Sequence, residues 1–335
     1  MKEMKLLVLR LTERCNLRCR YCYAARDGEA PFDMEAETAI RAVELSCPVG
    51  GKLKIQFAGG EPLLKLDVME AIHEFGRRTG RKLSMSVQTN GTLLSQEACR
   101  RLKAIRCGVG VSLDGIGKAN ALRCFPDGSP VFEVVANGIR NLGSVGMQCG
   151  LTTVVTSQNA AVLGQIPDLA LYFGNVGGVG LDLFRPIGRG AGQKLAADGD
   201  ALEAGLRSLK NKVQELNAAG IAFRFRELEL VQKRKTFNVC ADIYCYAQTD
   251  ESLCVDGHGD MWPCSSLAGD RRFYLGNLKD GLPEKNRGEF EGLKAPSVCR
   301  GCESYAHCLG GCPAARQGAI NPLVCRMHHI LSEES

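Results

Sequence analysis

Three cysteines near the start of the chain are spaced closely enough to share one metal centre. Cys15, Cys19 and Cys22 form a C-x3-C-x2-C pattern just after a short apolar run, Leu6–Leu11. A loop can turn three thiolates at this spacing toward one point. On a four-iron cluster they would leave one iron open for chemistry. The alternatives are a chance cluster or a zinc site, although zinc usually takes four ligands in paired C-x2-C groups.

A second concentration of cysteines begins near residue 240, where regular apolar periodicity fades. Metal ligation would supply the folding energy that such a segment lacks. Nine cysteines are about enough for two centres of four ligands each. They are Cys240, Cys245, Cys254, Cys264, Cys299, Cys302, Cys308, Cys312 and Cys325.

Composition narrows the class of protein. The chain has 335 residues, 17 cysteines and a net charge of +5, without a long Lys/Arg block that would indicate nucleic acid as the main partner. No signal peptide or membrane-spanning run is visible, so we expect a cytoplasmic protein. A reducing compartment disfavours a disulfide framework, and metal ligation then accounts for the clustered cysteines. The isolated ones, such as Cys47 and Cys99, are expected to be buried small hydrophobes.

The elements that must position these cysteines alternate between short apolar runs and longer amphipathic segments. Six strands, each followed by a crossover, predict an α/β fold with a parallel sheet, shorter than a full eight-repeat TIM barrel. The predicted strands are Lys5–Leu11, Lys52–Phe57, Lys82–Gln88, Gly108–Leu113, Gln148–Val155 and Val179–Phe184. The predicted helices are Met34–Ser46, Lys65–Arg78, Ser95–Ile105, Val131–Val145 and Val162–Phe173.

Regular strand and helix patterns give way to a sequence rich in Cys, Gly and Pro. This change predicts a partial barrel over 1–190, a bridging region over 191–239 and a Cys-rich domain over 240–335. Gly188 to Gly192 reads as a flexible break, before a helix near Ala201–Ala219 and a short strand, Ile221–Phe225. Polar and Gly-rich motifs follow each predicted strand, and ligands bind at the carboxyl ends of parallel strands. Taken singly, dipeptides such as Asn90-Gly91 are ordinary turns.

The first domain resembles the radical S-adenosylmethionine (radical SAM) superfamily, through the three-cysteine motif and Gly59-Gly60-Glu61-Pro62 in the expected order. The C-terminal part resembles the SPASM extension of peptide- and protein-maturing members. Its pattern runs from Cys254 and Cys264 through C-x2-C-x5-C-x3-C to a final cysteine. The last five positions are Cys299, Cys302, Cys308, Cys312 and Cys325.

This resemblance implies roles for the matching residues. Cys15, Cys19 and Cys22 would hold a [4Fe–4S] cluster whose open iron takes the amino and carboxylate groups of S-adenosyl-L-methionine (AdoMet). Tyr21 would lie near the adenine, and Gly59, Gly60, Glu61 and Pro62 would meet the methionine amino group. Thr89 and Ser112 match family positions that contact the cofactor. Arg123 would pair with the cofactor carboxylate, or form a structural salt bridge instead.

The resemblance also implies two auxiliary [4Fe–4S] clusters with interleaved ligands. The outer one would take Cys299, Cys302, Cys308 and Cys325. The inner one would take Cys254, Cys264 and Cys312, with Cys245 favoured over Cys240 as a fourth ligand. An inner cluster with an open site is the remaining alternative.

The implied activity is that of a radical SAM oxidoreductase acting on a ribosomally made peptide, by crosslinking, epimerisation or decarboxylation. Because no fused leader-binding domain is expected before the barrel, leader recognition would need a separate protein or the enzyme's own surface. A flavodoxin or ferredoxin would be the reductant. The alternative is a small-molecule enzyme of cofactor or tetrapyrrole biosynthesis. Sulfatase maturation is disfavoured, because Ser265 follows Cys264 where those relatives carry an acidic residue. A non-catalytic electron carrier or zinc-stabilised module would have no use for Gly59–Pro62.

Overall fold

The computed structural model describes residues 4–25, 31–237, 243–283, 291–316 and 319–333. Within these residues ten strands form one sheet, in the order β10-β9-β8-β1-β2-β3-β4-β5-β6-β7. From β1 to β7 all neighbours are parallel. These strands are β1 Leu6–Thr12, β2 Lys52–Gly59, β3 Lys82–Thr89, β4 Gly108–Ser112, β5 Cys149–Val155, β6 Val176–Leu183 and β7 Arg224–Phe225.

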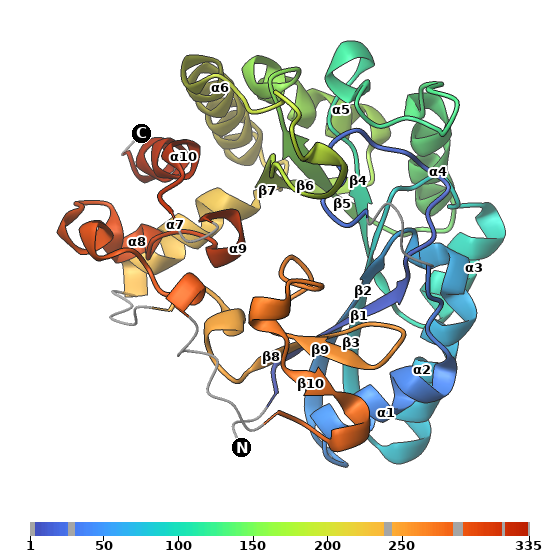
Figure 1. Cartoon of the computed structure of the whole chain (residues 1–335). Coiled ribbons are helices and arrows are strands. Elements are labelled where there is room, and N and C mark those ends of the chain that lie inside the picture. Colours follow the sequence, from blue (N-terminus) through green and yellow to red (C-terminus); the bar gives the residue numbers. More distant parts are fainter. Residues whose placement is uncertain (1–3, 26–30, 238–242, 284–290, 317–318, 334–335) are drawn as a thin grey trace.

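Helices cover the outer face of this curved sheet (Figure 1). They alternate with the strands along the chain, as α1 Ala36–Ser46, α2 Leu66–Thr79, α3 Gln96–Ala104, α4 Phe132–Ser144 and α5 Ile166–Phe173. Strand β2 shows why the sheet has two different faces. Leu53, Ile55 and Phe57 are buried in the main core, whereas Lys52 and Lys54, which alternate with them, are exposed. This alternation is the period-2 signal of a strand with one covered face.

The predicted α/β partial barrel is confirmed, and all six predicted strands are present. Several boundaries differ from those predicted, such as that of β6, which begins three residues before Val179. The helix expected from Val162 starts at Ile166, because Pro167 favours the first helical turn and a separate 3-10 segment, Ala160–Gln165, precedes it. The strand expected over Ile221–Phe225 is reduced to the two residues of β7.

The C-terminal segment continues the same sheet, which the sequence did not predict. Strand β8, Ser252–Val255, pairs with β1 in parallel, and Cys254 lies opposite Val8. Two short antiparallel strands, β9 Asp260–Trp262 and β10 Gly276–Asn277, extend this edge. The barrel and the start of the Cys-rich segment therefore share hydrogen-bonded strands.

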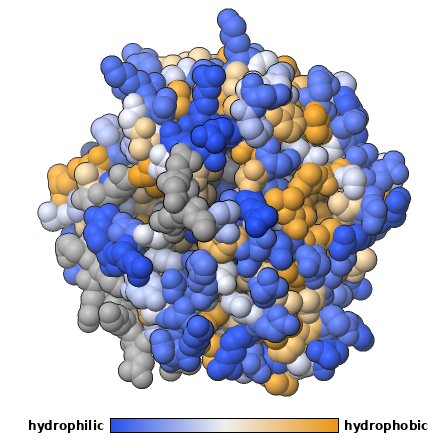
Figure 2. All heavy atoms as spheres, turned by 45° about the vertical axis from the view of Figure 1, so that its right-hand side comes forward, coloured by the Kyte–Doolittle hydropathy of each residue, from blue (hydrophilic) through white to orange (hydrophobic). Residues whose placement is uncertain are grey.

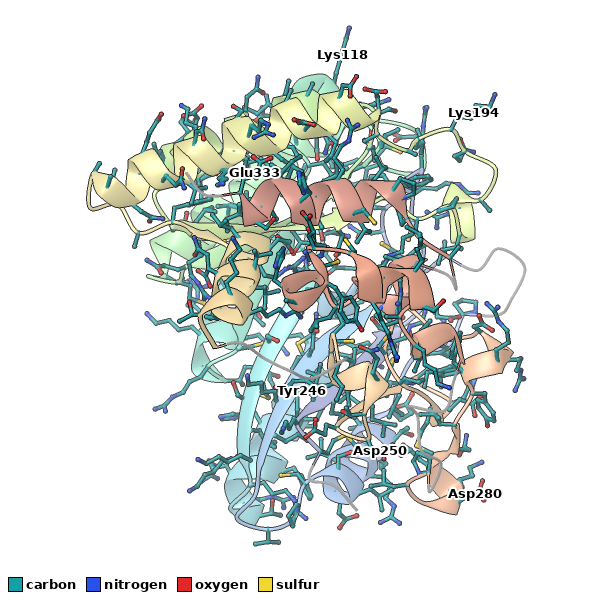
Figure 3. The ribbon with its side chains drawn as sticks, turned by 90° about the vertical axis from the view of Figure 1, so that its left-hand side faces the viewer. Lys118, Lys194, Tyr246, Asp250, Asp280 and Glu333 are labelled. Atoms are coloured by element: carbon teal, nitrogen blue, oxygen red, sulfur yellow. The ribbon has the colours of Figure 1, made fainter. Side chains whose placement is uncertain are left out.

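The remaining helices lie beyond β6 and carry part of the Cys-rich segment. They are α6 Gly199–Ala218, α7 Arg226–Phe237, α8 Tyr305–Cys308, α9 Pro313–Arg316 and α10 Pro322–Ser332. Helix α10 runs beside α6, with Glu333 between them (Figure 3). Glu333 pairs with Arg207, whose Nη2 lies 2.9 Å from Oε1, and its backbone oxygen accepts a hydrogen bond from Lys210.

Over the residues that the structure describes, no helix combines the length and apolar character needed to cross a membrane. One face of the molecule carries many hydrophilic side chains interrupted by apolar patches (Figure 2). An apolar contribution to the surface is normal for a folded protein.

Candidate active site

The three-cysteine loop leaves the carboxyl end of β1. Cys15 is exposed, Cys22 is partly buried and Cys19 is buried. Burial of the Cys15 thiol, together with the nearby Glu61, Cys19 and Cys22, raises its pKa to about 11, although a hydrogen bond from the Leu17 N–H opposes that rise. Three thiols gathered in one short loop form a donor set that suits a cationic iron centre.

The backbone of this loop is fixed by segments that follow β4 and β6. The Arg18 and Arg20 N–H groups donate to the carbonyl oxygens of Cys124 and Leu122, at 2.8 and 2.9 Å. Arg189 donates from Nη1 to the Cys19 carbonyl at 3.1 Å and from its backbone N–H to the Cys22 carbonyl at 3.0 Å. The loop is therefore positioned by contacts that are distant in sequence.

Gly188 and Arg189 lie in the segment that was interpreted as a flexible break, and this interpretation was wrong for its first residues. Gly188 has a φ of 58°, and a Cβ there would lie 2.5 Å from the Cys22 carbonyl oxygen. Glycine is needed at this position for close approach to the loop. The alternating glycines at 188, 190 and 192 favoured the interpretation as a flexible break and did not indicate this contact.

Gly59 and Gly60 lie directly against the chain that leads into the cysteine loop. A Cβ on Gly59 would lie 2.3 Å from the Thr12 carbonyl oxygen, and one on Gly60 would lie 2.2 Å from that of Arg14. The N–H groups of Gly60 and Glu61 donate to these same two oxygens, at 2.6 and 2.8 Å. The glycines thus bring the end of β2 into hydrogen-bonding distance of the loop.

Replacing Gly60 by alanine is expected to displace the cysteine loop, because the new methyl group overlaps backbone rather than a movable side chain. A shift of about 1 Å can cost about 100-fold in rate, and we expect a loss of that order in 5′-deoxyadenosine formation. Gly108→Ala is the matched control, since its nearest neighbour would be 3.7 Å away. Equal activity of the two variants would contradict this view of Gly60.

Glu61 connects the ends of β2 and β3. Its fully buried carboxylate accepts hydrogen bonds from the Leu63 N–H at 3.0 Å, the Thr89 hydroxyl at 2.6 Å and the Asn90 N–H at 2.8 Å. Burial raises its pKa, and these hydrogen bonds oppose that rise. The Asn90 side-chain amide lies 3.7 Å from the Cys15 sulfur. Thr89 therefore uses its hydroxyl within the protein, and Asn90 is a site residue that the sequence prediction missed.

Tyr21, Asp114 and Arg123 form a buried hydrogen-bonded group beside the loop. The Tyr21 hydroxyl donates to Asp114 and accepts from Arg123 Nη1 at 2.6 Å. Burial opposes the charge on Arg123, but Tyr21, Cys19 and Asp114 raise its pKa above the ordinary value. Its Nε is buried without a hydrogen-bond partner. The unmatched N–H can donate a hydrogen bond to a ligand oxygen.

Ser112 and Pro62 complete the residues predicted to bind the cofactor. Ser112 ends β4 and accepts a hydrogen bond from the Gln88 side chain at 3.0 Å, on the inner side of the barrel. Pro62 begins the turn after Glu61 and is buried. The structure thus brings the predicted cofactor residues to the carboxyl ends of β1 to β4.

The C-terminal cysteines fall into two groups in space. The first group lines one cavity of about 440 Å3 and comprises Cys299, Cys302, Cys308 and Cys325. The second group contains Cys245, Cys264 and Cys312. Burial raises the pKa of Cys264 to about 12, and the Cys312 and Cys245 thiols add to this rise. Cys254 packs in the same apolar cluster as Cys264 and Cys312. Cys240 lies outside the described residues.

Helix α10 carries Cys325, the last member of the first group. Its neighbour Arg326 pairs with Asp200 of α6 at 2.6 Å, next to the Glu333 contacts. Among the described residues no three His, Cys, Asp or Glu side chains are arranged around a single metal ion. In an iron–sulfur cluster each thiolate binds its own iron, so the sulfurs need not converge on one point.

Known proteins resemble this chain in sequence over most of its length. The family model for the radical SAM superfamily matches residues 9–166. An uncharacterised protein of Methanocaldococcus jannaschii is 30% identical over 302 residues, covering 89% of this chain and 94% of that protein. The AdoMet-dependent heme synthase of Nitratidesulfovibrio vulgaris is 26% identical over 343 residues, covering 92% of this chain and 89% of that enzyme.

Solved structures share the fold over almost the whole chain. The structure of anSMEcpe with bound AdoMet has a TM-score of 0.83 at 22% identity, covering 98% of this chain and 96% of that one. Streptococcus suis SuiB bound to precursor peptide SuiA has a TM-score of 0.68 at 17% identity, covering 96% and 76%. Together with the sequence relatives, these matches show that the chain belongs to the radical SAM superfamily of enzymes, whose members bind AdoMet and a [4Fe–4S] cluster.

Proposed function

We propose that this enzyme generates a 5′-deoxyadenosyl radical to abstract hydrogen from a peptide substrate. One observation carries the proposal. A cavity of about 410 Å3 is lined by Tyr23, which follows Cys22, by Ser265, which follows Cys264, and by Pro313, which follows Cys312. A substrate in this cavity would lie between the first cysteine loop and the second group of C-terminal cysteines. Its volume is within the range of ligand pockets.

Cys15, Cys19 and Cys22 would hold the radical SAM cluster in this proposal. The AdoMet site would be formed by the end of β2, together with Tyr21, Thr89, Ser112 and Arg123. When bound, the cluster and AdoMet supply the radical that attacks an unactivated carbon. The protein would orient the two cofactors through the fixed loop.

Two auxiliary [4Fe–4S] clusters would occupy the C-terminal cysteine groups in residues 240–335. The outer group comprises Cys299, Cys302, Cys308 and Cys325, and the inner one Cys245, Cys254, Cys264 and Cys312. The inner cluster would accept the electron left when the substrate radical is oxidised. A flavodoxin or ferredoxin would reduce the first cluster, and a separate protein would present the leader of the peptide.

Anaerobic reconstitution is expected to load about 12 iron atoms per chain, in three clusters of four. The check is an iron and sulfide assay on the desalted protein. A value of about four would refute both auxiliary clusters, and about eight would refute one of them.

A peptide substrate is in keeping with the fold shared with SuiB, which was solved with its precursor peptide. Tetrapyrrole modification is the second candidate, favoured by the full-length similarity to the heme synthase. The enzyme would be incubated with AdoMet, dithionite and either a short peptide encoded beside its gene or an iron porphyrin bearing propionates. A mass change in the peptide supports the first function, and a mass change in the porphyrin replaces it with the second. If no condition yields 5′-deoxyadenosine, both functions fail.

A further inference from the structure

Arg185, just beyond the end of β6, lies between the first cysteine loop and the inner group of cysteines. Its guanidinium carbon stands 5.2 Å from the centre of the Tyr23 ring. Its Nη1 is buried and has no hydrogen-bond partner. Burial opposes the charge on Arg185, but the neighbouring Asp182, Cys312, Tyr23 and Cys264 raise its pKa above the ordinary value. A partly buried cation with an enclosed Nη1 thus lies near two of the sulfurs proposed to bind the inner cluster.

Tyr23 fixes the position of this guanidinium relative to the first cysteine loop and to the inner group of cysteines. It is bonded directly to Cys22 in the chain, and its hydroxyl shares a hydrogen bond with Ser265, the residue after Cys264. Tyr23 and Ser265 both line the cavity described above. The cation–π contact and this hydrogen bond therefore hold Arg185 at the boundary between the barrel and the Cys-rich segment.

A cation at this position changes the energy of a one-electron reduction. A cluster bound by thiolates carries negative charge, and an added electron makes it more negative by one. A nearby positive charge stabilises the reduced form more than the oxidised form, and burial strengthens this because the local dielectric constant is low. The negative charge of Asp182 opposes part of this effect. However, Asp182 also lies 3.6 Å from Arg226, so its charge is divided between two arginines.

We propose that Arg185 raises the reduction potential of the inner auxiliary cluster, through its partly buried guanidinium held over the Tyr23 ring beside Cys264 and Cys312. This inference rests on the proposed function, because it requires the inner cluster. Arg185 is a tuning residue in this role and need not touch the substrate. Its charge would make the inner cluster a better electron acceptor than it would otherwise be.

The experiment is a redox titration of the reconstituted full chain, followed by electron paramagnetic resonance. Replacing Arg185 by methionine keeps the length of the side chain and removes its charge. At a fixed potential we expect the ratio of oxidised to reduced inner cluster to rise about tenfold, equal to about 59 mV for one electron. The signal of the outer cluster serves as an internal reference and should not shift. Arg185→Lys keeps the charge and is expected to restore most of the potential.

Arg272→Met is the matched control. Arg272 lines the cavity that Tyr23 and Ser265 also line, but its side chain is 77% exposed and pairs with Asp270. An unchanged inner potential in Arg185→Met at full iron content would overturn the inference and leave the proposed function standing. The same shift in Arg272→Met, or an equal shift of the outer cluster, would also overturn it. If the wild-type protein held only about four iron atoms per chain, it would contain no auxiliary clusters, and the inference would fail with them.

Discussion

Replacing Cys15, Cys19 and Cys22 together by alanine is expected to remove about four iron atoms per chain and to reduce 5′-deoxyadenosine formation to background. The physical reason is that these thiols form the donor set of the loop after β1. The auxiliary clusters should remain, because their proposed ligands all lie beyond residue 240. The measurements are iron content and the yield of 5′-deoxyadenosine with dithionite as reductant.

Cys99→Ala is the control for this experiment. Cys99 lies in α3 on the side of the helix that packs into the core, where it is fully buried and away from the cysteine loop. Its removal leaves a small cavity and should lower the unfolding temperature without changing iron content. If the triple variant kept its full iron and its AdoMet cleavage, the assignment of the first cluster would be wrong.

Replacing Arg123 by methionine is expected to destabilise the protein by about 3–5 kcal/mol, because it leaves a buried carboxylate without its counter-ion. Asp114 is 2% exposed, and it reaches Arg123 through the shared Tyr21 hydroxyl. Burial raises the pKa of Asp114, and Arg123 opposes that rise. The measurement is urea unfolding followed by circular dichroism.

A double variant separates charge from packing at this site. Adding Asp114→Asn to Arg123→Met removes the uncompensated charge, so stability should return in part, as coupling within one network requires. Arg140→Met, on the exposed face of α4, is the control and should change stability by less than about 0.5 kcal/mol. Equal losses in the single and double variants would show that Arg123 acts by packing alone.

The barrel could be predicted because its signals are local. The alternation in β2 and the cap of α3, where the Ser95 hydroxyl accepts the Ala98 N–H at 3.1 Å, are visible within a few residues of sequence. The ends of the strands then placed Gly59–Pro62 and Ser112 at one edge, because parallel strands share their polarity.

The rest depended on contacts between distant residues. The pairing of β8 with β1 joins positions about 250 residues apart, and four-residue strands carry too little periodicity to predict it. Asn90 reads as part of a turn, yet its side-chain amide meets Cys15. Helix α10 was missed because the dense cysteines drew the interpretation of that segment toward metal ligation alone, whereas α7 lies in the bridging region, where no helix was predicted beyond Ala219. The role of Arg189 depends on a close backbone approach that composition does not encode.

The strand pairing at β8 has a consequence for how the enzyme can be divided. Strand β1 leads into the first cysteine loop, while β8 carries Cys254 at the position opposite Val8. A chain cut before β8 would expose one side of β1 as a bare sheet edge, with unpaired amide and carbonyl groups open to other chains. The C-terminal segment thus also protects the barrel from self-association.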